Sequence, residues 1–270
     1  MLRIGSTPLS GVIVNHPPTA VVGSDMTVEC ESPTGSRIVL DGGASFDSDT
    51  GDSLSHFQWF EDLDGGAADE SEGPSPPNSV PLSNRSLTTV QATLGSHRYE
   101  LHVYDRSLAS DKAIQHVKVV DTTAPQLRVE PATVCLWPPN HAFALFTLGQ
   151  ELQVSVSDGC DTNPTVWIDS VEANEPELAV GSGNTTPDVV AGTEAACVRS
   201  ERAGPGVGRT YTVTLKARDL SCNTSSVKVQ VLVPHDLSGH PACKRATGLD
   251  APDERCSAGA PIPQCVPPAP

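Results

Sequence analysis

The chain has 270 residues, including 24 prolines and 22 glycines, and a formal net charge of −16. This acidity argues against nucleic acid or an anionic membrane as a partner, because both are polyanions that attract lysine and arginine. The surplus carboxylates either keep the protein soluble or bind a hard cation such as Ca²⁺ through oxygen ligands. Frequent turn-forming residues, and the lack of sustained helical spacing of apolar residues, predict an all-β fold.

Eight cysteines are spread along the chain without a C-x-x-C pair, which argues against a zinc site and for disulfides. Disulfides indicate an oxidising compartment, so we expect a secreted or cell-surface location. No apolar signal segment opens the sequence, and no run is long enough to cross a membrane. We therefore expect this chain to be a part of a longer exported protein.

One pattern occurs twice. Residues 98–121 and 210–236 both read as two alternating strands around a short polar turn, which predicts a β-hairpin with one buried face. The copies align without a gap when Asp105 is placed on Asp219. An acid at the end of a strand lies near the rim of the sheet, where neighbouring loops bring further oxygen ligands. The sequence thus predicts two β domains in tandem, each closing with the same hairpin.

Composition shifts divide the chain into a remnant strand or linker at 1–14, a β-sandwich at 15–120, a second β-sandwich at 121–236 and a Cys/Pro-rich tail at 237–270. Alternating or aromatic segments predict the remaining strands, at residues 27–30, 37–40, 56–60, 90–94, 127–129, 134–136, 153–157 and 166–171. Trp59 is expected to fill the first core. Polar segments predict a mobile loop at 62–81 and a long connection at 174–195.

Four segments of the first domain carry a resemblance. They are N-x-P-P-x-A at 15–20, V-L-D-G-x-x-S-x-D-x-D at 39–49, Trp59, and Y-x-L-x-V-x-D at 99–105. Together they resemble the PKD domain, an immunoglobulin-like β-sandwich common in bacterial exoenzymes and surface proteins. The resemblance implies the same fold for residues 15–120.

The second domain has D-T-T-A-P at 121–125, L-W-P-P-N-H at 136–141, D-G-C-D at 158–161 and D-x-S-x-N at 219–223. These segments are similar to the Ig-like or HYR-like repeats that follow PKD domains in secreted bacterial proteins. In this chain Cys222 replaces the glycine of the usual D-x-S-G-N.

Some PKD domains bind Ca²⁺ near their entrance, and the resemblance implies that Asn15, Asp47, Asp49 and Asp105 form such a site here. Three carboxylates and an amide oxygen are hard ligands, and backbone carbonyls or waters complete a coordination number of about six to eight. In the alternative interpretation, Asp47 and Asp49 only shape their loop while Asp105 accepts bonds from backbone amides.

A second cation site is predicted in the second domain. Its ligands would be Asp121, Asp158, Asp161 and Asp219, with Asn163 or Asn223 assisting. Such a site would stiffen the tandem, whereas short Asx turns explain the same residues without a metal.

The disulfide easiest to defend joins Cys160 and Cys222, because each cysteine lies just beyond an aspartate that ends a strand. Cys135 and Cys197 would then be the remaining pair of that domain. Spacing does not fix connectivity, so other pairings stay open.

The tail is expected to be either a disulfide-stapled appendage or a linker. Within it, Cys256 would pair with Cys243 or Cys265, leaving one tail cysteine for Cys30 or for a segment outside this sequence.

No G-x-S-x-G, H-E-x-x-H or glycine-rich phosphate loop is present, so we expect a non-catalytic protein. The predicted role is a spacer or adhesion segment of a larger secreted or surface protein, with extracellular polysaccharide or protein as partner. The alternative is the substrate-attachment region of a secreted hydrolase whose catalytic domain lies elsewhere. Trp137 is expected either to contact such a partner or to cover the end of the core, and His141 to be a hydrogen-bonding partner.

Overall fold

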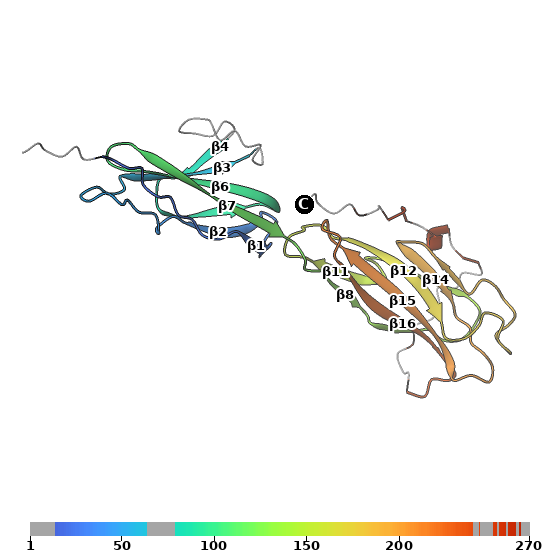
Figure 1. The fold of residues 1–270 in the computed structure, drawn as a ribbon. Coiled ribbons are helices and arrows are strands. Elements are labelled where there is room, and N and C mark those ends of the chain that lie inside the picture. Colours follow the sequence, from blue (N-terminus) through green and yellow to red (C-terminus); the bar gives the residue numbers. More distant parts are fainter. Residues whose placement is uncertain are drawn as a thin grey trace, which may run out of the picture. The chain divides into compact units, whose positions relative to one another are not determined.

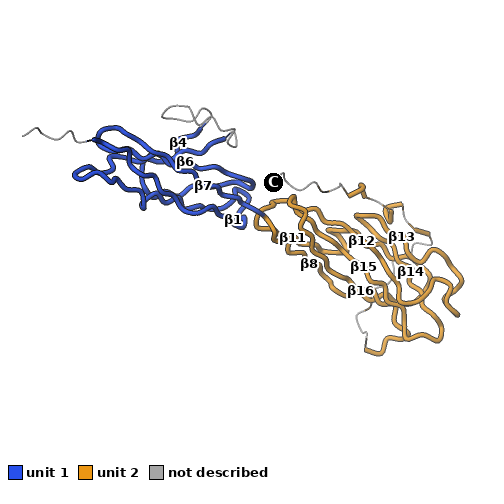
Figure 2. The backbone as a smooth tube through the Cα atoms, in the orientation of Figure 1, with its two compact units in different colours: residues 1–120, 270 blue, residues 121–269 orange. Residues whose placement is uncertain are grey.

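A computed structural model describes residues 14–63, 79–239, 243, 251–252, 254–257, 259–262 and 265. The described residues up to Val120 form one compact unit, and those from Asp121 onward form a second (Figures 1 and 2). Both units are immunoglobulin-like β-sandwiches, which confirms the predicted fold class. The remnant predicted at 1–14 lies outside the described residues except for Val14. Of the loop predicted at 62–81, residues 64–78 lie outside them, whereas Asp62 and residues 79–81 belong to strands and correct the predicted ends of that loop.

Unit 1 is a sandwich of a five-stranded and a two-stranded sheet. Its strands are β1 (Met26–Glu29), β2 (Ser36–Asp41), β3 (His56–Asp62), β4 (Ser79–Ser83), β5 (Leu87–Ala92), β6 (Gly95–Tyr104) and β7 (Ser110–Val120). The larger sheet has the order β1-β7-β6-β3-β4, and β2 pairs with β5. All pairs are antiparallel except β1 with β7.

The core of unit 1 follows the period-two pattern of its strands. Tyr99, Leu101 and Val103 alternate along β6 and are fully buried. Trp59 on β3 is also fully buried, as predicted, and its indole Nε1 donates to the Ser86 carbonyl at 3.4 Å. Burial of these large side chains is the main driving force for packing the two sheets.

Unit 2 is a sandwich built from three hydrogen-bonded groups of strands. They are β8 (Gln126–Glu130), β9 (Thr133–Cys135), β10 (Phe143–Thr147), β11 (Gln153–Ser157), β12 (Thr165–Ala173), β13 (Val189–Ala191), β14 (Ala195–Arg199), β15 (Gly208–Arg218) and β16 (Thr224–Pro234). The strand orders are β12-β15-β16-β9, β10-β14-β13 and β11-β8. Tyr211, Val213 and Leu215 of β15 are fully buried in one apolar cluster, together with alternating valines of β16.

The two predicted hairpins are present as β6–β7 and β15–β16, and their turns are the same. In unit 1, Asp105 N donates to the Ala109 carbonyl at 3.0 Å, and Ala109 N donates to Asp105 Oδ1 at 2.9 Å. In unit 2, Asp219 N donates to the Asn223 carbonyl at 3.2 Å, and Asn223 N donates to Asp219 Oδ1 at 2.8 Å.

Each turn also needs one residue with positive φ, three positions after the aspartate. Leu108 takes it in unit 1 at 67° and Cys222 in unit 2 at 74°. Glycine is the residue that adopts this conformation without steric cost, so the glycine of the D-x-S-G-N motif that residues 219–223 resemble would fit the same turn.

The tail is stapled to unit 2, and the partners of its cysteines correct the predicted pairs Cys160–Cys222 and Cys135–Cys197. The structure contains the disulfides Cys135–Cys243, Cys197–Cys256 and Cys222–Cys265. Cys256 therefore pairs with neither Cys243 nor Cys265. The described part of the chain has no free cysteine.

We call residues 243–265 the strap, of which the structure describes Cys243, Cys265 and the short stretches between them. Cys256 is fully buried against Phe143, Leu145 and Cys197. Within the strap, Cys256 thus covers the face of β10 and β14 that points away from the main core. Its 3₁₀ turn η1 (Glu254–Ser257) is the only helix in the described ranges. Nothing in those ranges is a helix with the length and apolarity needed to cross a membrane.

Candidate cation sites and a buried charge network

Three aspartates of unit 1 form what we call the first acidic cluster. Asp47 and Asp52 lie in the loop between β2 and β3, and Asp105 directly follows β6. One carboxylate oxygen of each lies within 4.8 Å of the other two. Asp105 is fully buried, whereas Asp47 and Asp52 are half-buried. The loop therefore carries two negative charges to the end of the closing hairpin.

Hydrogen bonds fix part of this cluster and leave one oxygen unused. Asn15 Nδ2 donates to Asp105 Oδ2 at 2.7 Å, and Asp49 N donates to Asp47 Oδ1 at 2.7 Å. The other oxygen of Asp47, Oδ2, is buried and has no hydrogen-bond partner among the described residues. A buried carboxylate oxygen without a donor is costly unless a proton or a cation satisfies it.

The predicted ligand Asp49 is not part of the first acidic cluster, and Asp52 takes its place. The Asp49 carboxylate accepts from the backbone N of His16 at 2.6 Å and contacts His16 Nδ1 at 2.8 Å. These bonds lower the pKa of Asp49, the backbone bond contributing most. Asp49 thus ties the entrance segment to the loop, while Asn15 reaches the cluster through Asp105.

Unit 2 has a second acidic cluster at the equivalent end of its own hairpin. Asp121 opens the unit, Asp158 follows β11 and Asp219 follows β15. One oxygen of each again lies within 4.8 Å of the others. Burial raises the pKa of Asp121, and the negative charges of Asp219 and Asp158 add to this effect. The neighbouring carboxylates therefore oppose the ionisation of Asp121, and a bound cation would relieve that repulsion.

The second acidic cluster also leaves a carboxylate oxygen unused. Asp158 Oδ1 accepts from Cys160 N at 2.8 Å and from Asp161 N at 2.9 Å. Asp158 Oδ2 is buried without a hydrogen-bond partner in the described part of the chain. The two clusters thus share a buried hairpin aspartate and a neighbouring aspartate with an unsatisfied oxygen.

Asp161, the fourth predicted ligand, has a different task. Its carboxylate accepts from Asn163 N at 2.8 Å and from Leu220 N at 3.1 Å, so it connects two loops. Asn223 donates from Nδ2 to Asp219 Oδ2 at 3.0 Å and to the Asp121 carbonyl at 3.0 Å. Asn223 therefore connects Asp219 to the backbone of Asp121, and both of these residues belong to the second acidic cluster.

Both clusters fit a calcium ion in their chemistry. Each offers three carboxylates, at least one of them with a free buried oxygen, and Ca²⁺ takes about six to eight oxygen ligands that include carbonyls and waters. The residues that would hold the ion are Asp47, Asp52 and Asp105 in unit 1, and Asp121, Asp158 and Asp219 in unit 2.

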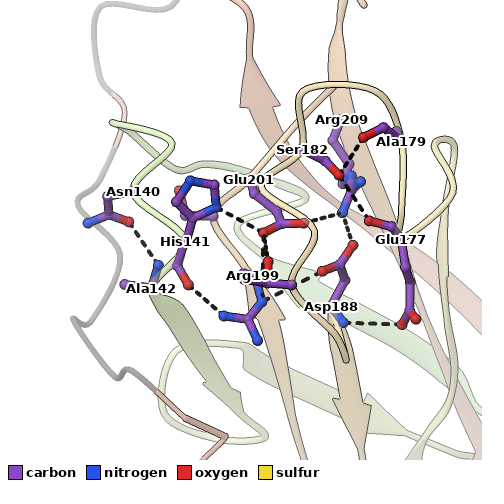
Figure 3. Close-up of polar contacts among 12 residues, drawn as sticks. Asn140, His141, Ala142, Glu177, Ala179, Ser182, Asp188, Arg199, Glu201 and Arg209 are labelled. Carbon is purple, nitrogen blue, oxygen red and sulfur yellow. Dashed lines mark hydrogen bonds and ion pairs between the residues drawn. The ribbon is translucent and has the colours of Figure 1, made fainter. Parts of the chain in front are cut away.

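A third polar feature lies among the loops of unit 2, and Figure 3 labels Arg199, Arg209, Asp188 and Glu201 of it. We call it the buried charge network. It consists of Arg199, Arg209, Asp188, Glu201 and Glu175. Arg209 and Glu201 have fully buried side chains, and Asp188 is 1% exposed. Charged groups are buried in this way only when they are paired.

The guanidinium groups of the network also hold the backbone. Arg199 Nη1 donates to the His141 carbonyl at 2.8 Å, and Arg209 Nη2 donates to the Pro176 carbonyl at 2.9 Å. Tyr211 donates from its hydroxyl to the Arg199 carbonyl at 2.8 Å. The network therefore connects the loops before β10, after β12 and after β14.

His141 is a hydrogen-bonding partner, as expected. Its Nδ1 lies 3.0 Å from Glu201 Oε2, while about half of its side chain is exposed. Gly183 packs on its ring, since a Cβ at Gly183 would lie 2.4 Å from His141 Cε1. Trp137 is half-buried in the same loop.

Sequence reasoning missed Asp52 and the buried charge network. Asp52 is a third acid in an acidic loop, and only the turn of that loop decides which acids face Asp105. Arg199 and Glu201 belong to an R-x-E-R segment whose mixture of charges would ordinarily be solvated. Their burial results from long-range packing, which no local pattern encodes.

The fold and the acidic clusters define a tandem of immunoglobulin-like modules. No family model matches the chain, and no curated protein matches it. Similar solved structures include the Dpr2 Ig1–Ig2 complex with DIP-Theta Ig1–Ig3, with a TM-score of 0.27, 12% identity, and coverage of 80% of this chain and 64% of that one. The fibronectin(III)-like modules of Clostridium thermocellum CbhA have a TM-score of 0.26 and 11% identity, with coverage of 80% of this chain and 94% of that one. Protocadherin gamma B2 cadherin domains 1–5 have a TM-score of 0.31 and 18% identity, with coverage of 80% of this chain and 40% of that one. At these values the similarity assigns no function to this chain.

Proposed function

We propose that this chain is a non-catalytic extracellular module, a spacer or adhesion segment whose two sandwiches each bind Ca²⁺ at the end of the closing hairpin. The observation that carries the proposal is the repetition of one arrangement. In both units the same five-residue turn presents a buried aspartate, Asp105 or Asp219, to two further carboxylates within 4.8 Å. PKD-like and HYR-like domains remain the proposed family assignments of units 1 and 2.

Calcium would stabilise the module by neutralising carboxylates that otherwise repel. In each cluster it would also satisfy a buried oxygen that lacks a donor, Asp47 Oδ2 or Asp158 Oδ2. Because the ligands come from loops distant in sequence, such an ion would join loop and hairpin and stiffen each sandwich. The disulfides of unit 2 support the proposed oxidising, extracellular setting.

Calorimetric unfolding in millimolar Ca²⁺ and in EGTA tests the cation sites. A ligand that binds only the folded state stabilises it by RT ln(1 + [L]/Kd), about 2.7 kcal/mol at a hundredfold excess over Kd. We expect Ca²⁺ to raise the unfolding temperature of the wild type. Asp52→Asn should abolish the gain in unit 1 and Asp158→Asn the gain in unit 2.

Asp49→Asn is the matched control, because Asp49 is an acid of the same loop that lies outside the first acidic cluster. It should keep the full response to Ca²⁺. A wild-type transition that is the same in Ca²⁺ and EGTA would overturn the cation sites, and loss of the response in Asp49→Asn instead of Asp52→Asn would overturn the ligand set.

The alternative role is attachment of a secreted hydrolase to its substrate. Co-sedimentation of the chain with insoluble cellulose, chitin or collagen separates the two roles. Saturable binding to one of these would favour attachment, whereas their failure to retain the chain would favour a spacer.

A further inference from the structure

The buried charge network brings two carboxylates onto the same pair of guanidinium groups (Figure 3). Asp188 is bonded through Oδ2 to Arg209 Nη1, and its Oδ1 lies 3.6 Å from Arg199 Nε. Glu201 places Oε1 at 3.6 Å from Arg209 Nη1 and Oε2 at 3.8 Å from Arg199 Nε. Both carboxylates are thus confined to one small volume from which water is excluded.

Each of these acids has one oxygen that lacks a hydrogen bond. Asp188 Oδ1 and Glu201 Oε1 are both buried without a hydrogen-bond partner among the described residues. Two ionised carboxylates can only accept, so neither can satisfy the other. A single proton changes this, because a carboxylic acid donates to the neighbouring carboxylate.

The charge balance of the network also calls for one proton. Arg199 and Arg209 supply two positive charges, while Asp188, Glu201 and Glu175 supply three negative charges when ionised. An uncompensated buried charge is strongly unfavourable, whereas one shared proton makes the network neutral.

The other groups that face the pair come from the surrounding loops. His141 Nδ1 lies 3.0 Å from Glu201 Oε2, and Thr185 donates to the same oxygen. Glu177 Oε1 accepts from Asp188 N at 3.1 Å, and the Tyr211 hydroxyl accepts from Arg209 Nη1 at 3.2 Å. Only His141 among these brings a further positive charge when protonated, and it lies at the solvent side.

We propose that Asp188 and Glu201 share one proton and that this pair is a pH-sensitive clamp on the loops before β10, before β13 and after β14. With the proton in place, the network is neutral and the loops are held together. When the pair ionises fully, two carboxylates repel each other inside the unit and the loops loosen. The loop end of unit 2 is therefore more firmly closed at mildly acidic pH than at neutral or alkaline pH.

The electrostatics agree with this geometry. Burial is the main cause that raises the pKa of Asp188 from 3.8 to about 6; the neighbouring Glu201 carboxyl adds to the shift, and Arg209 opposes it. A folded-state pKa above the unfolded value means that the stabilising contribution is complete below pH 3.8 and is lost as pH rises through 6. The clamp thus opens over the range in which most acidic residues have already ionised.

Carboxyl carbon NMR of the wild type tests the proposal without any substitution. We expect the side-chain carboxyl resonance of Asp188 to titrate with a midpoint near pH 6. In Glu201→Gln the midpoint of Asp188 should fall below that value by at least one pH unit, because the repelling partner is gone. Glu172→Gln, which removes an exposed carboxylate of β12, should leave the midpoint unchanged. Titration of the wild-type Asp188 carboxyl below pH 5 would overturn the shared proton.

Amide hydrogen exchange of β14 peptides tests the clamp itself. At each pH the opening constant of the wild type is divided by that of Asp188→Asn, which removes intrinsic exchange effects. With pKa values of 6 folded and 3.8 unfolded, this ratio should rise roughly twentyfold between pH 4.5 and 7. A ratio that stays constant over this range would refute the clamp.

Discussion

Asn15 donates from Nδ2 to Asp105 Oδ2 at 2.7 Å, although 90 residues separate the two in sequence. Asp105 is fully buried, and its other oxygen accepts from Ala109 N at 2.9 Å. The bond thus joins the entrance of unit 1 to the end of its closing hairpin.

Substitution of Asn15 measures what this bond contributes. Asn15→Ala leaves a buried carboxylate oxygen without its donor, so unit 1 should lose about 1–3 kcal/mol of unfolding free energy in EGTA. Because Ca²⁺ would satisfy the same oxygen, the loss should shrink in millimolar Ca²⁺. Urea unfolding in the two buffers gives both values. An equal loss in both would show that Asp105 does not meet a cation.

The repeated hairpin shows how much of these sites the sequence predicts. Period-two alternation on both sides of Asp105 and Asp219 locates the two hairpins, because strands with one buried face must alternate. The choice of Asp52 over Asp49 depends on how a fourteen-residue loop folds back, and no spacing rule encodes that. The nearby acids were therefore predictable as a group but not one by one.

Strands β10 and β14 escaped prediction for a related reason. Phe143 and Leu145 pack under the strap, while Ala144 and Phe146 belong to the main core. A strand buried on both faces loses its alternation, and a run such as F-A-L-F is equally compatible with a helix. The disulfide partners were unpredictable because they depend on contacts between Cys243, Cys256 or Cys265 and residues of unit 2 that are distant in sequence.

A second prediction concerns Glu100, a buried acid on β6. The hydrogen bond with His102 Nε2, 2.6 Å away, is the main cause that lowers the pKa of Glu100 below its usual 4.5. A lowered folded-state pKa stabilises the protein above pH 4.5 and is lost as pH falls. The opening constant of β6 amides, obtained by dividing the exchange rate by the intrinsic rate at each pH, should therefore rise on acidification from pH 5 to 3, and Glu100→Gln should weaken this dependence. An identical pH dependence in the variant would contradict it.

The strap gives a third prediction. Removing Cys197–Cys256 by a double alanine substitution should cost unit 2 about 2–4 kcal/mol through the released loop, and more through the apolar contacts of Cys256. The matched control removes the Cys222–Cys265 disulfide. Its cysteines are 43 residues apart in sequence, compared with 59 for Cys197–Cys256, and they lie outside the apolar cluster around Cys256. Urea unfolding should show the larger loss for the first pair. Equal losses would mean that the strap only closes loops and adds no core.

The last prediction concerns Gly183, which has a φ of +95° and packs on the ring of His141. In Gly183→Ala the new Cβ would lie 2.4 Å from His141 Cε1, so the imidazole must move away from Glu201. Gly149→Ala is the control, because Gly149 has a φ of +77° and open space around it. In both variants an alanine must adopt a positive φ, which lowers the unfolding free energy by about 1–2 kcal/mol, and the clash with His141 adds to this loss only at Gly183. We expect urea unfolding of unit 2 to show a larger loss for Gly183→Ala, and nitrogen NMR to show a changed environment of His141 Nδ1 in that variant alone. Equal losses with an unchanged His141 would mean that the contact between Gly183 and His141 does not hold the imidazole on Glu201.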